Sequence, residues 1–105
     1  MTTRRIIPRE SALADFDDIY DRLASQASEA TAGEVLRKLD RAIQLLADQP
    51  RLGRPYDHRE HPLRVLTHGD YRVFYREQGA EIDLLRVING RRNIPDVLDE
   101  LDGLL

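Results

Sequence analysis

Residues 63–89 read LRVLTHGDYRVFYREQGAEIDLLRVIN. Three apolar runs in this stretch alternate with a period of two, and two short segments with a central glycine separate them, at 68–70 and 78–80. Period-two alternation is typical of β-strands, and glycine-centred breaks of this length are typical of hairpin turns. The predicted strands, joined as antiparallel hairpins, cover residues 63–67, 71–76 and 82–89.

Alternation along the middle strand separates two sets of side chains. One face carries Tyr71, Val73 and Tyr75, and the other carries Arg72, Phe74 and Arg76. The third strand is apolar on both faces in its core, IDLLRVI. We therefore expect it near the centre of the sheet, with other parts of the chain covering both of its sides.

The residues before this stretch follow helical spacing instead. A first helix from about residue 9 to 26 has Asp15 on its polar face. Ser28 is the expected N-cap of a second helix, which ends near Gln49 because Pro50 follows. The apolar stripe of the first helix consists of Leu13, Phe16, Ile19 or Tyr20, Leu23 and Ala27.

Three further segments complete the pattern. We predict a strand over residues 4–7, a proline-punctuated loop over 50–62 and a short helix over 94–103. The order β-α-α-β-β-β with a final helix indicates an α+β fold in which an antiparallel two-helix hairpin packs on one face of an antiparallel sheet. With 105 residues in all, we expect one domain over 1–105.

Composition excludes several classes of protein. The chain has no cysteine, which removes disulfide frameworks, thiolate metal sites and cysteine nucleophiles. No apolar window approaches the length of a membrane span or of a signal-peptide core, so we expect a cytoplasmic protein. The net charge of −3 gives no general attraction to nucleic acid, although residues 51–92 hold nine arginines against six acids.

The usual catalytic and metal-binding motifs are absent from the sequence. His58 and His61 stand three residues apart beside acidic residues, but they lack a third fixed ligand, and transition-metal sites normally take three or four. We interpret them as solvated loop side chains and expect neither a metal nor a cofactor.

Arginines are the remaining candidates for chemistry. Arg72, Arg76 and Arg86 stand on predicted strands, and Arg91 and Arg92 follow the last strand. Such a cluster can hold the phosphates of RNA, because a guanidinium group matches phosphate oxygens with a fork of donors. The same residues are also consistent with solvated charges, with partners of nearby acids, or with a face that docks an acidic peptide. The amino-acid composition alone does not decide which of these roles the arginines have.

Five segments, taken in order, resemble toxins of the RelE/ParE superfamily of bacterial type II toxin–antitoxin systems. They are ALADFDDIYDRL, LDRAIQLLADQPRLGRP, LRVL, YRVFYRE and IDLLRVINGRRNI, and they span about residues 6 to 101. The resemblance implies the same fold that the periodicity predicts, an antiparallel sheet carrying a helical hairpin.

RelE-type members of the superfamily are ribosome-dependent mRNA endoribonucleases. By resemblance, Arg72 and Arg92 match two catalytic arginines of those enzymes, and Arg64 is the basic residue on the preceding strand. Leu98 stands where they carry a proton-transferring tyrosine or histidine, and leucine cannot transfer a proton. The chain is also net acidic, whereas RelE-type proteins tend to be basic. These two differences from the RelE-type enzymes, Leu98 and the net acidic charge, weaken the nuclease interpretation. They make an enzyme the less favoured class.

ParE-type members share the fold, lack the nuclease residues and inhibit DNA gyrase. The ending LLRVINGRRNI resembles this plasmid-stabilisation branch, which makes Arg91 and Arg92 the expected target contacts. We therefore expect a ParE-like gyrase inhibitor, with the RelE-like endonuclease as the alternative. A third possibility is a non-toxic protein that only binds its antitoxin as a co-repressor.

Both branches imply a cognate antitoxin, in the family a small protein with a DNA-binding amino-terminal part and a tail that folds on the toxin. The toxin then contacts DNA only indirectly, through the antitoxin, and no membrane is involved. Phe74, Arg72 and Arg76 are the expected antitoxin contacts, because aromatic and arginine side chains dominate interface energetics.

Overall fold

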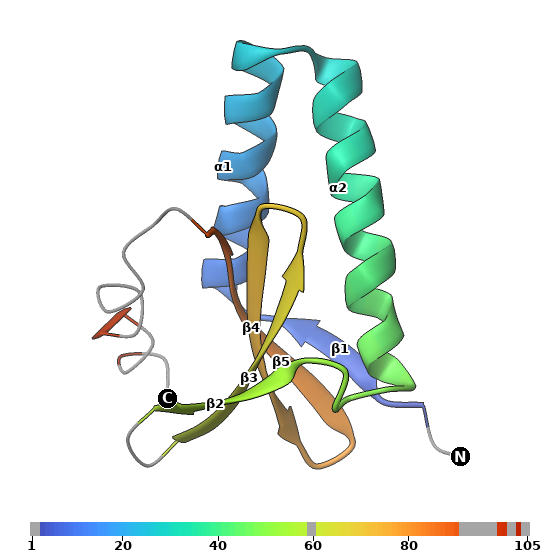
Figure 1. Cartoon of the computed structure of the whole chain (residues 1–105), viewed down its shortest axis with the longest axis vertical. Helices are drawn as coiled ribbons and strands as arrows, with labels where there is room; N and C mark the ends of the chain where they lie inside the picture. The colour runs from blue at the N-terminus through green and yellow to red at the C-terminus, as the bar shows by residue number, and fades with distance from the viewer. Residues whose placement is uncertain (1–2, 59–60, 91–98, 101–102, 104–105) are drawn as a thin grey trace.

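The computed structural model describes residues 3–58, 61–90, 99–100 and 103. In this part of the chain a five-stranded sheet carries a hairpin of two long helices, which run side by side and connect at the end far from β1 (Figure 1). This arrangement confirms the predicted α+β fold. The elements in chain order are β1 (Arg5–Pro8), α1 (Glu10–Gln26), α2 (Glu29–Gln44), the 3-10 turn η1 (Leu45–Ala47), β2 (Arg54–His58), β3 (His61–His68), β4 (Tyr71–Gln78) and β5 (Glu81–Asn89).

The strand order is β1-β5-β4-β3-β2, which places β5 in the interior of the sheet. The neighbours from β2 to β5 are antiparallel, and this pairing was predicted for β3, β4 and β5. At the opposite edge β1 pairs with β5 in parallel, with Ile6 opposite Ile82, so the sheet is mixed where we expected antiparallel pairing. Alternation indicates that a segment is a strand but not its direction. A parallel neighbour requires a long crossover, and here the chain from α1 to β4 provides it.

Both predicted hairpin turns are present. β3 and β4 are joined by Gly69 and Asp70, and β4 and β5 are joined by Gly79 and Ala80. The two glycines have φ angles of 58° and 60°. Two-residue hairpin loops need a positive φ at their first position to match the twist of the strands, and glycine adopts it without steric cost.

The loop predicted over residues 50–62 contains a strand, so this prediction is wrong for β2. β2 pairs with β3, with Tyr56 opposite Leu63 and Pro55 opposite Arg64. Proline cannot donate a ladder hydrogen bond, but an edge strand leaves half of its backbone groups unpaired and therefore tolerates it. Prolines in this segment indicated a loop, whereas the structure uses the segment as the edge of the sheet.

The helices differ in how well their sequences identify their buried faces. Ser28 caps α2 as predicted, since its Oγ accepts a hydrogen bond from the Thr31 N–H at 3.0 Å. In α1 the buried residues are Ala12, Asp15 and Ile19, whereas Leu13 is 50% exposed. The placement of Asp15 on the polar face is therefore wrong. Ile19 is buried and Phe16 and Leu23 pack against the core, as predicted, so the buried face keeps these residues and extends to Ala12 and Asp15 in place of Leu13.

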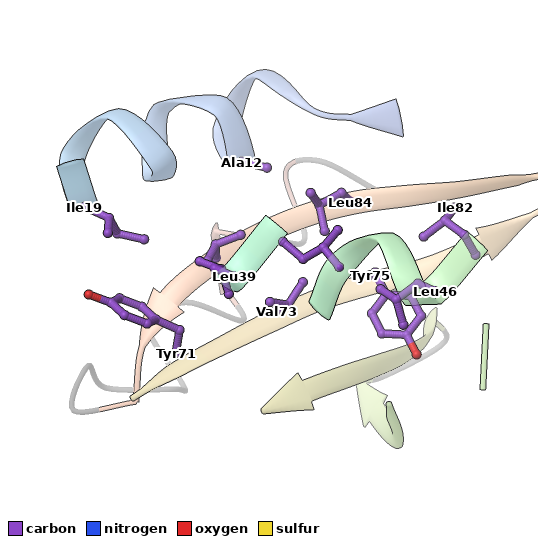
Figure 2. Packing of buried hydrophobic residues seen from close by; sticks show 11 residues of the cluster. Ala12, Ile19, Leu39, Leu46, Tyr71, Val73, Tyr75, Ile82 and Leu84 are labelled. Carbon is purple, nitrogen blue, oxygen red and sulfur yellow. The ribbon is translucent and has the colours of Figure 1, made fainter. Parts of the chain in front are cut away.

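The core lies between the helical hairpin and the sheet (Figure 2). Tyr71, Val73 and Tyr75 of β4 all point into it, which confirms the predicted face. A second cluster contains Leu63, Val65, Phe74, Leu85 and Ile88. β5 contributes to both clusters, as expected for a strand that is apolar on both faces.

One tyrosine fixes the segment that leads into β2. The buried Tyr75 hydroxyl donates a hydrogen bond to the Pro50 carbonyl and accepts one from the Gly53 N–H, both at 2.8 Å. Burial raises the pKa of Tyr75, and the hydrogen bond from Gly53 offsets part of that rise. A Cβ at Gly53 would lie 2.6 Å from the Tyr75 Oη and 2.9 Å from the Val65 carbonyl oxygen, so only glycine fits here.

The helix predicted over 94–103 lies mostly outside the described residues. Of that range the structure describes Asp99 and Glu100, which are helical, and Gly103. Among the described residues, no helix is long and apolar enough to span a membrane.

Candidate functional site

Arg72 lies in a small pocket at the end of the β3–β4 hairpin. The guanidinium-bearing side chain is half-buried and has no hydrogen-bond or ion-pair partner within the described part of the chain. The pocket has a volume of about 190 Å³, and its lining consists of Thr67, Gly69, Asp70, Arg72, Asn89 and Gly90. A Cβ at Gly90 would lie 3.5 Å from the Arg72 Nε, so the glycine leaves this side of the guanidinium open.

The other candidate arginines of this sheet are engaged elsewhere. The Arg64 Nη1 donates to the Gly53 carbonyl at 2.8 Å, which ties β3 to the segment before β2. The Arg76 Nε lies 3.1 Å from Asp83 on β5. Arg64 and Arg76 line one pocket of about 260 Å³, but Arg72 lines a different one, so the structure does not bring the three together.

Asp83 is shared by two arginines from different parts of the chain. The Arg9 Nε and Nη2 donate to its two carboxylate oxygens at 2.8 and 3.0 Å, and Arg76 adds its own bond. Burial alone would raise the pKa of Asp83, but the hydrogen bonds and charges of Arg9 and Arg76 outweigh it and hold that pKa below its ordinary value. This cluster joins the start of α1 to β4 and β5.

Arg86 forms the most buried ion pair in the described chain. Its Nε and Nη2 donate to the two carboxylate oxygens of Asp15 at 2.7 and 2.9 Å, and its Nη1 donates to Glu100. The same Asp15 carboxylate also accepts the Val87 N–H at 2.8 Å. The hydrogen bonds to Asp15 raise the pKa of Arg86 above its ordinary value, against the lowering effect of burial.

Sequence reasoning placed Arg86 among the cations and missed both of its partners. The sequence contains a clue for Arg86 and another for Asp15. Arg86 is the single charged residue within the run LLRVI, and an arginine that must be buried needs a carboxylate. Asp15 stands three residues after Ala12 and four before Ile19, which is the spacing of one helix face. Seventy-one positions separate the pair, so only the fold shows that they meet.

β5 contains a bulge next to Arg86. Phe74 of β4 is opposite Arg86, but the next residue, Tyr75, is opposite Leu84, so Leu85 has no partner in β4. A bulge of this kind adds one residue to a strand and redirects the side chains beside it. It separates the inward pair Leu84 and Val87 from Leu85, which packs in the second cluster.

A groove that sequence reasoning also missed runs along α2. Two adjoining hollows of about 420 and 590 Å³ share Arg41. Leu45, at the end of α2, is 51% exposed in it. We define the α2 groove by its lining residues, which are Leu36, Arg37, Lys38, Asp40, Arg41, Ala42, Leu45 and His68. Its floor is apolar, and its cations outnumber its single acid.

The remaining predicted site residues fall into two groups. Arg91, Arg92 and Leu98 lie outside the described residues. Phe74 is fully buried, with Tyr56 packed against it edge to face at 5.8 Å between ring centroids. A partner can reach Phe74 only if this packing opens, so its role as a contact residue stays a prediction.

The two histidines considered as metal ligands lie on neighbouring strands. His58 and His61 are opposite each other in the β2–β3 pairing. Within residues 3–58, 61–90, 99–100 and 103, no group of three histidine, cysteine, aspartate or glutamate side chains is placed to hold a metal ion.

Known proteins resemble this chain along most of its length. Residues 6–94 match the family model described as ParE toxin of type II toxin-antitoxin system, parDE. Toxin ParE1 of Mycobacterium tuberculosis is 32% identical over 91 residues, which cover 86% of this chain and 93% of that protein. Toxin ParE1 of Caulobacter vibrioides is 29% identical over 82 residues, covering 78% and 84%.

The fold also matches a solved structure. A chain of the chromosomal ParDE TA system from P. aeruginosa superposes with a TM-score of 0.73 at 23% sequence identity. The match covers 83% of this chain and 96% of the other. The strand–helix–helix–sheet arrangement described above is therefore shared with that protein.

Proposed function

Because the chain belongs to the ParE toxin family of type II toxin–antitoxin systems, we propose that it binds and inhibits DNA gyrase and that a cognate antitoxin neutralises it. In this proposal the toxin acts in the cytoplasm by binding and not by catalysis. It contacts DNA only through the antitoxin, whose tail folds on the toxin surface.

The separation of Arg72 from Arg64 and Arg76, which line a different pocket, carries the preference for binding over RNA cleavage. A nuclease needs several cations around one phosphate and a group that moves a proton. Arg64 is held by Gly53 and Arg76 by Asp83. Among the described residues, the Arg72 pocket adds only Asp70 as a second ionisable group, and its negative charge opposes a phosphate.

The endonuclease remains a second candidate because of Arg72 itself. A half-buried guanidinium without a described partner, facing an open pocket, is suited to binding an oxyanion. Under this alternative Arg72 stabilises the scissile phosphate, so removing it abolishes the activity. Under the gyrase proposal the same substitution leaves toxicity largely intact.

For the antitoxin, we propose the α2 groove as the main docking surface. Its apolar floor with Leu45 exposed suits an amphipathic helix, and its cations Arg37, Lys38 and Arg41 suit acidic residues on that helix. The sequence-based contacts Arg72 and Arg76 would then lie at secondary positions.

The proposed target is tested by pulse labelling of cells minutes after induction of this protein alone, with thymidine and methionine incorporation measured in parallel. Early loss of thymidine incorporation is expected. Early loss of methionine incorporation with DNA synthesis intact would instead favour the ribosome. If neither falls while the protein accumulates, the chain acts only as an antitoxin-binding partner in that host.

Purified components give the direct test. The wild-type chain and Arg72→Ala are both expected to inhibit supercoiling by DNA gyrase at similar concentrations, and neither is expected to cleave mRNA on ribosomes. Loss of all toxicity in Arg72→Ala, together with ribosome-dependent cleavage by the wild type, would replace the gyrase proposal with the nuclease.

The antitoxin surface is tested with two leucines of equal exposure. Leu45, in the α2 groove, is 51% exposed, and Leu13, on α1 outside it, is 50% exposed. Leu45→Glu is expected to remain toxic when the antitoxin is coexpressed, whereas Leu13→Glu is expected to be neutralised like the wild type. Neutralisation of both variants would show that the antitoxin docks elsewhere.

A further inference from the structure

The pocket of about 260 Å³ that Arg64 and Arg76 share lies where β3 begins and β4 ends. Its lining combines two cations, one acid and three apolar residues, which are Arg64, Arg76, Glu77, Pro55, Pro62 and Leu63. Two guanidinium groups in one small volume repel each other unless an anion lies between them. The pocket therefore favours a negatively charged occupant.

Each arginine of this pocket is fixed through one nitrogen and keeps other donors. The Arg64 Nη1 donates to the Gly53 carbonyl at 2.8 Å, and the Arg76 Nε donates to Asp83 at 3.1 Å. A guanidinium group has five N–H donors. In the part of the chain that the structure describes, no residue binds the Nε or Nη2 of Arg64 or either Nη of Arg76. The two groups are thus oriented in advance and still able to bind an anion.

The apolar walls of the pocket indicate what carries the negative charge. Leu63 is 3% exposed, and the other two apolar residues are prolines, Pro55 on β2 and Pro62 on β3. Such walls favour an anion with a hydrocarbon stem, because burying each methylene group is favourable. A glutamate side chain has two methylene groups before its carboxylate, and the fork of donors on a guanidinium group matches that carboxylate.

Glu77 limits the charge of the occupant. Its side chain is 31% exposed, and its carboxylate lies 3.4 Å from the Arg4 Nη2. Like charges in one site oppose each other, and the repulsion grows with the charge of the ligand. A single carboxylate is therefore a better occupant of this pocket than a doubly charged phosphate group.

We infer that Arg64 and Arg76 form a subsite that binds a glutamate side chain of an acidic peptide. β2, which supplies Pro55, is an edge of the sheet, so an extended segment of another protein can run beside it. The subsite shares no lining residue with the α2 groove. Only the assignment of this peptide to the tail of the antitoxin rests on the proposed function.

Binding of a fluorescent hexaglutamate peptide to the full chain tests the subsite, at low salt because salt screens exposed charges. Arg64→Gln is expected to weaken binding about ten- to hundredfold, as for the loss of one charge-assisted hydrogen bond. The matched control Arg22→Gln removes an exposed arginine from α1 and is expected to bind like the wild type. Equal binding by Arg64→Gln and the wild type would overturn the inference.

A second variant has an effect of opposite sign, which matters because Arg64 also holds Gly53 and its loss can disturb the fold. Glu77→Gln removes the like charge from the lining and is expected to tighten binding about two- to fivefold, a gain that unfolding cannot produce. Glu29→Gln makes the same change at the start of α2, outside the pocket, and is expected to have the wild-type affinity. Equal tightening in both variants would show a general charge effect and no subsite.

Other occupants give different results. Weaker binding by Arg41→Gln, with Arg64→Gln unaffected, would place the peptide in the α2 groove. Tighter binding of hexauridylate or of inorganic phosphate than of hexaglutamate would make the pocket a site for RNA or for phosphate, and absence of saturable hexaglutamate binding would also overturn the inference. None of these measurements contains gyrase or antitoxin, so they decide the subsite even if the wild type fails to inhibit supercoiling.

Discussion

The two buried charge clusters are built in opposite ways. In one, the carboxylate of Asp83 accepts hydrogen bonds from two guanidinium groups, those of Arg9 and Arg76. In the other, the guanidinium of Arg86 donates hydrogen bonds to two carboxylates, those of Asp15 and Glu100. Both join α1 to β5, one near the start of the helix and one further along it.

The groups left behind when a buried carboxylate is lost differ in access to water, and this decides how each cluster affects stability. The Arg9 and Arg76 side chains are 37% and 19% exposed, so either can be solvated if Asp83 is lost. Asp15 and Arg86 are 10% and 9% exposed, so neither can be. The Asp83 cluster is therefore expected to tolerate damage that the Arg86 cluster does not.

The largest effect is expected for Asp15→Ala. It leaves the Arg86 charge buried beside a partly exposed glutamate and also removes the acceptor of the Val87 N–H. We expect a loss of about 3–5 kcal/mol of unfolding free energy, measured by urea denaturation. Asp18→Ala, an exposed substitution on the same helix, is expected to change it by less than about 0.5 kcal/mol. Equal effects of the two would remove the distinction between the clusters.

A smaller loss is expected for Asp83→Asn. The amide keeps the shape and one acceptor oxygen, and the two arginines left behind are partly solvated. We expect about 1–3 kcal/mol less unfolding free energy at neutral pH, the range for hydrogen bonds to charged groups. A loss as large as that of Asp15→Ala would mean that exposure of the outer arginines gives no protection.

The Asp83 cluster also predicts a pH dependence. The folded-state pKa of Asp83 lies below the unfolded value of about 3.9. The contribution of ionised Asp83 to the unfolding free energy is therefore fully present above about pH 4. It is lost as the pH falls through the folded-state pKa. Unfolding free energies of the wild type and Asp83→Asn, measured from neutral pH downward, are expected to differ by a constant amount and to converge below about pH 4. Parallel curves throughout would contradict this.

The smallest change in stability is expected for Glu100→Gln, because the glutamate is half exposed and Arg86 keeps Asp15. Exposed ion pairs contribute about 0–1 kcal/mol, and denaturation is expected to show a loss in that range. A loss above about 2 kcal/mol would make Glu100 part of the buried network with Asp15 and Arg86.

The elements that depend on local patterns were predictable, and those that depend on distant partners were not. Alternation in 71–76 identified β4 and its helix-facing side, and Ser28 identified the start of α2, because each signal lies within a few residues. β2 was missed because Pro55 is a breaker in isolation and acceptable only at a sheet edge, and edge position is a property of the whole sheet.

The candidate site was less predictable for the same reason. The sequence suggested one cluster of arginines, but three of them are bound to partners that the local sequence pattern does not identify. Arg76 binds Asp83, Arg86 binds Asp15, and Arg64 binds the backbone of Gly53. Arg72 lines one pocket, whereas Arg64 and Arg76 share another of about 260 Å³. The α2 groove was not predicted because Leu36, Ala42 and Leu45 lie on an amphipathic helix, whose apolar residues normally face the core.

The contact between the Tyr75 hydroxyl and Gly53 has a consequence for how this sequence can change over time. As long as tyrosine stands at 75, position 53 is closed to every side chain, because a Cβ would overlap the Tyr75 ring. Replacing the tyrosine by a smaller residue leaves the Pro50 and Gly53 backbone groups without their partner, and a Cβ at 53 would still lie 2.9 Å from the Val65 carbonyl oxygen. Position 53 is therefore expected to remain glycine among relatives of this fold even where position 75 varies.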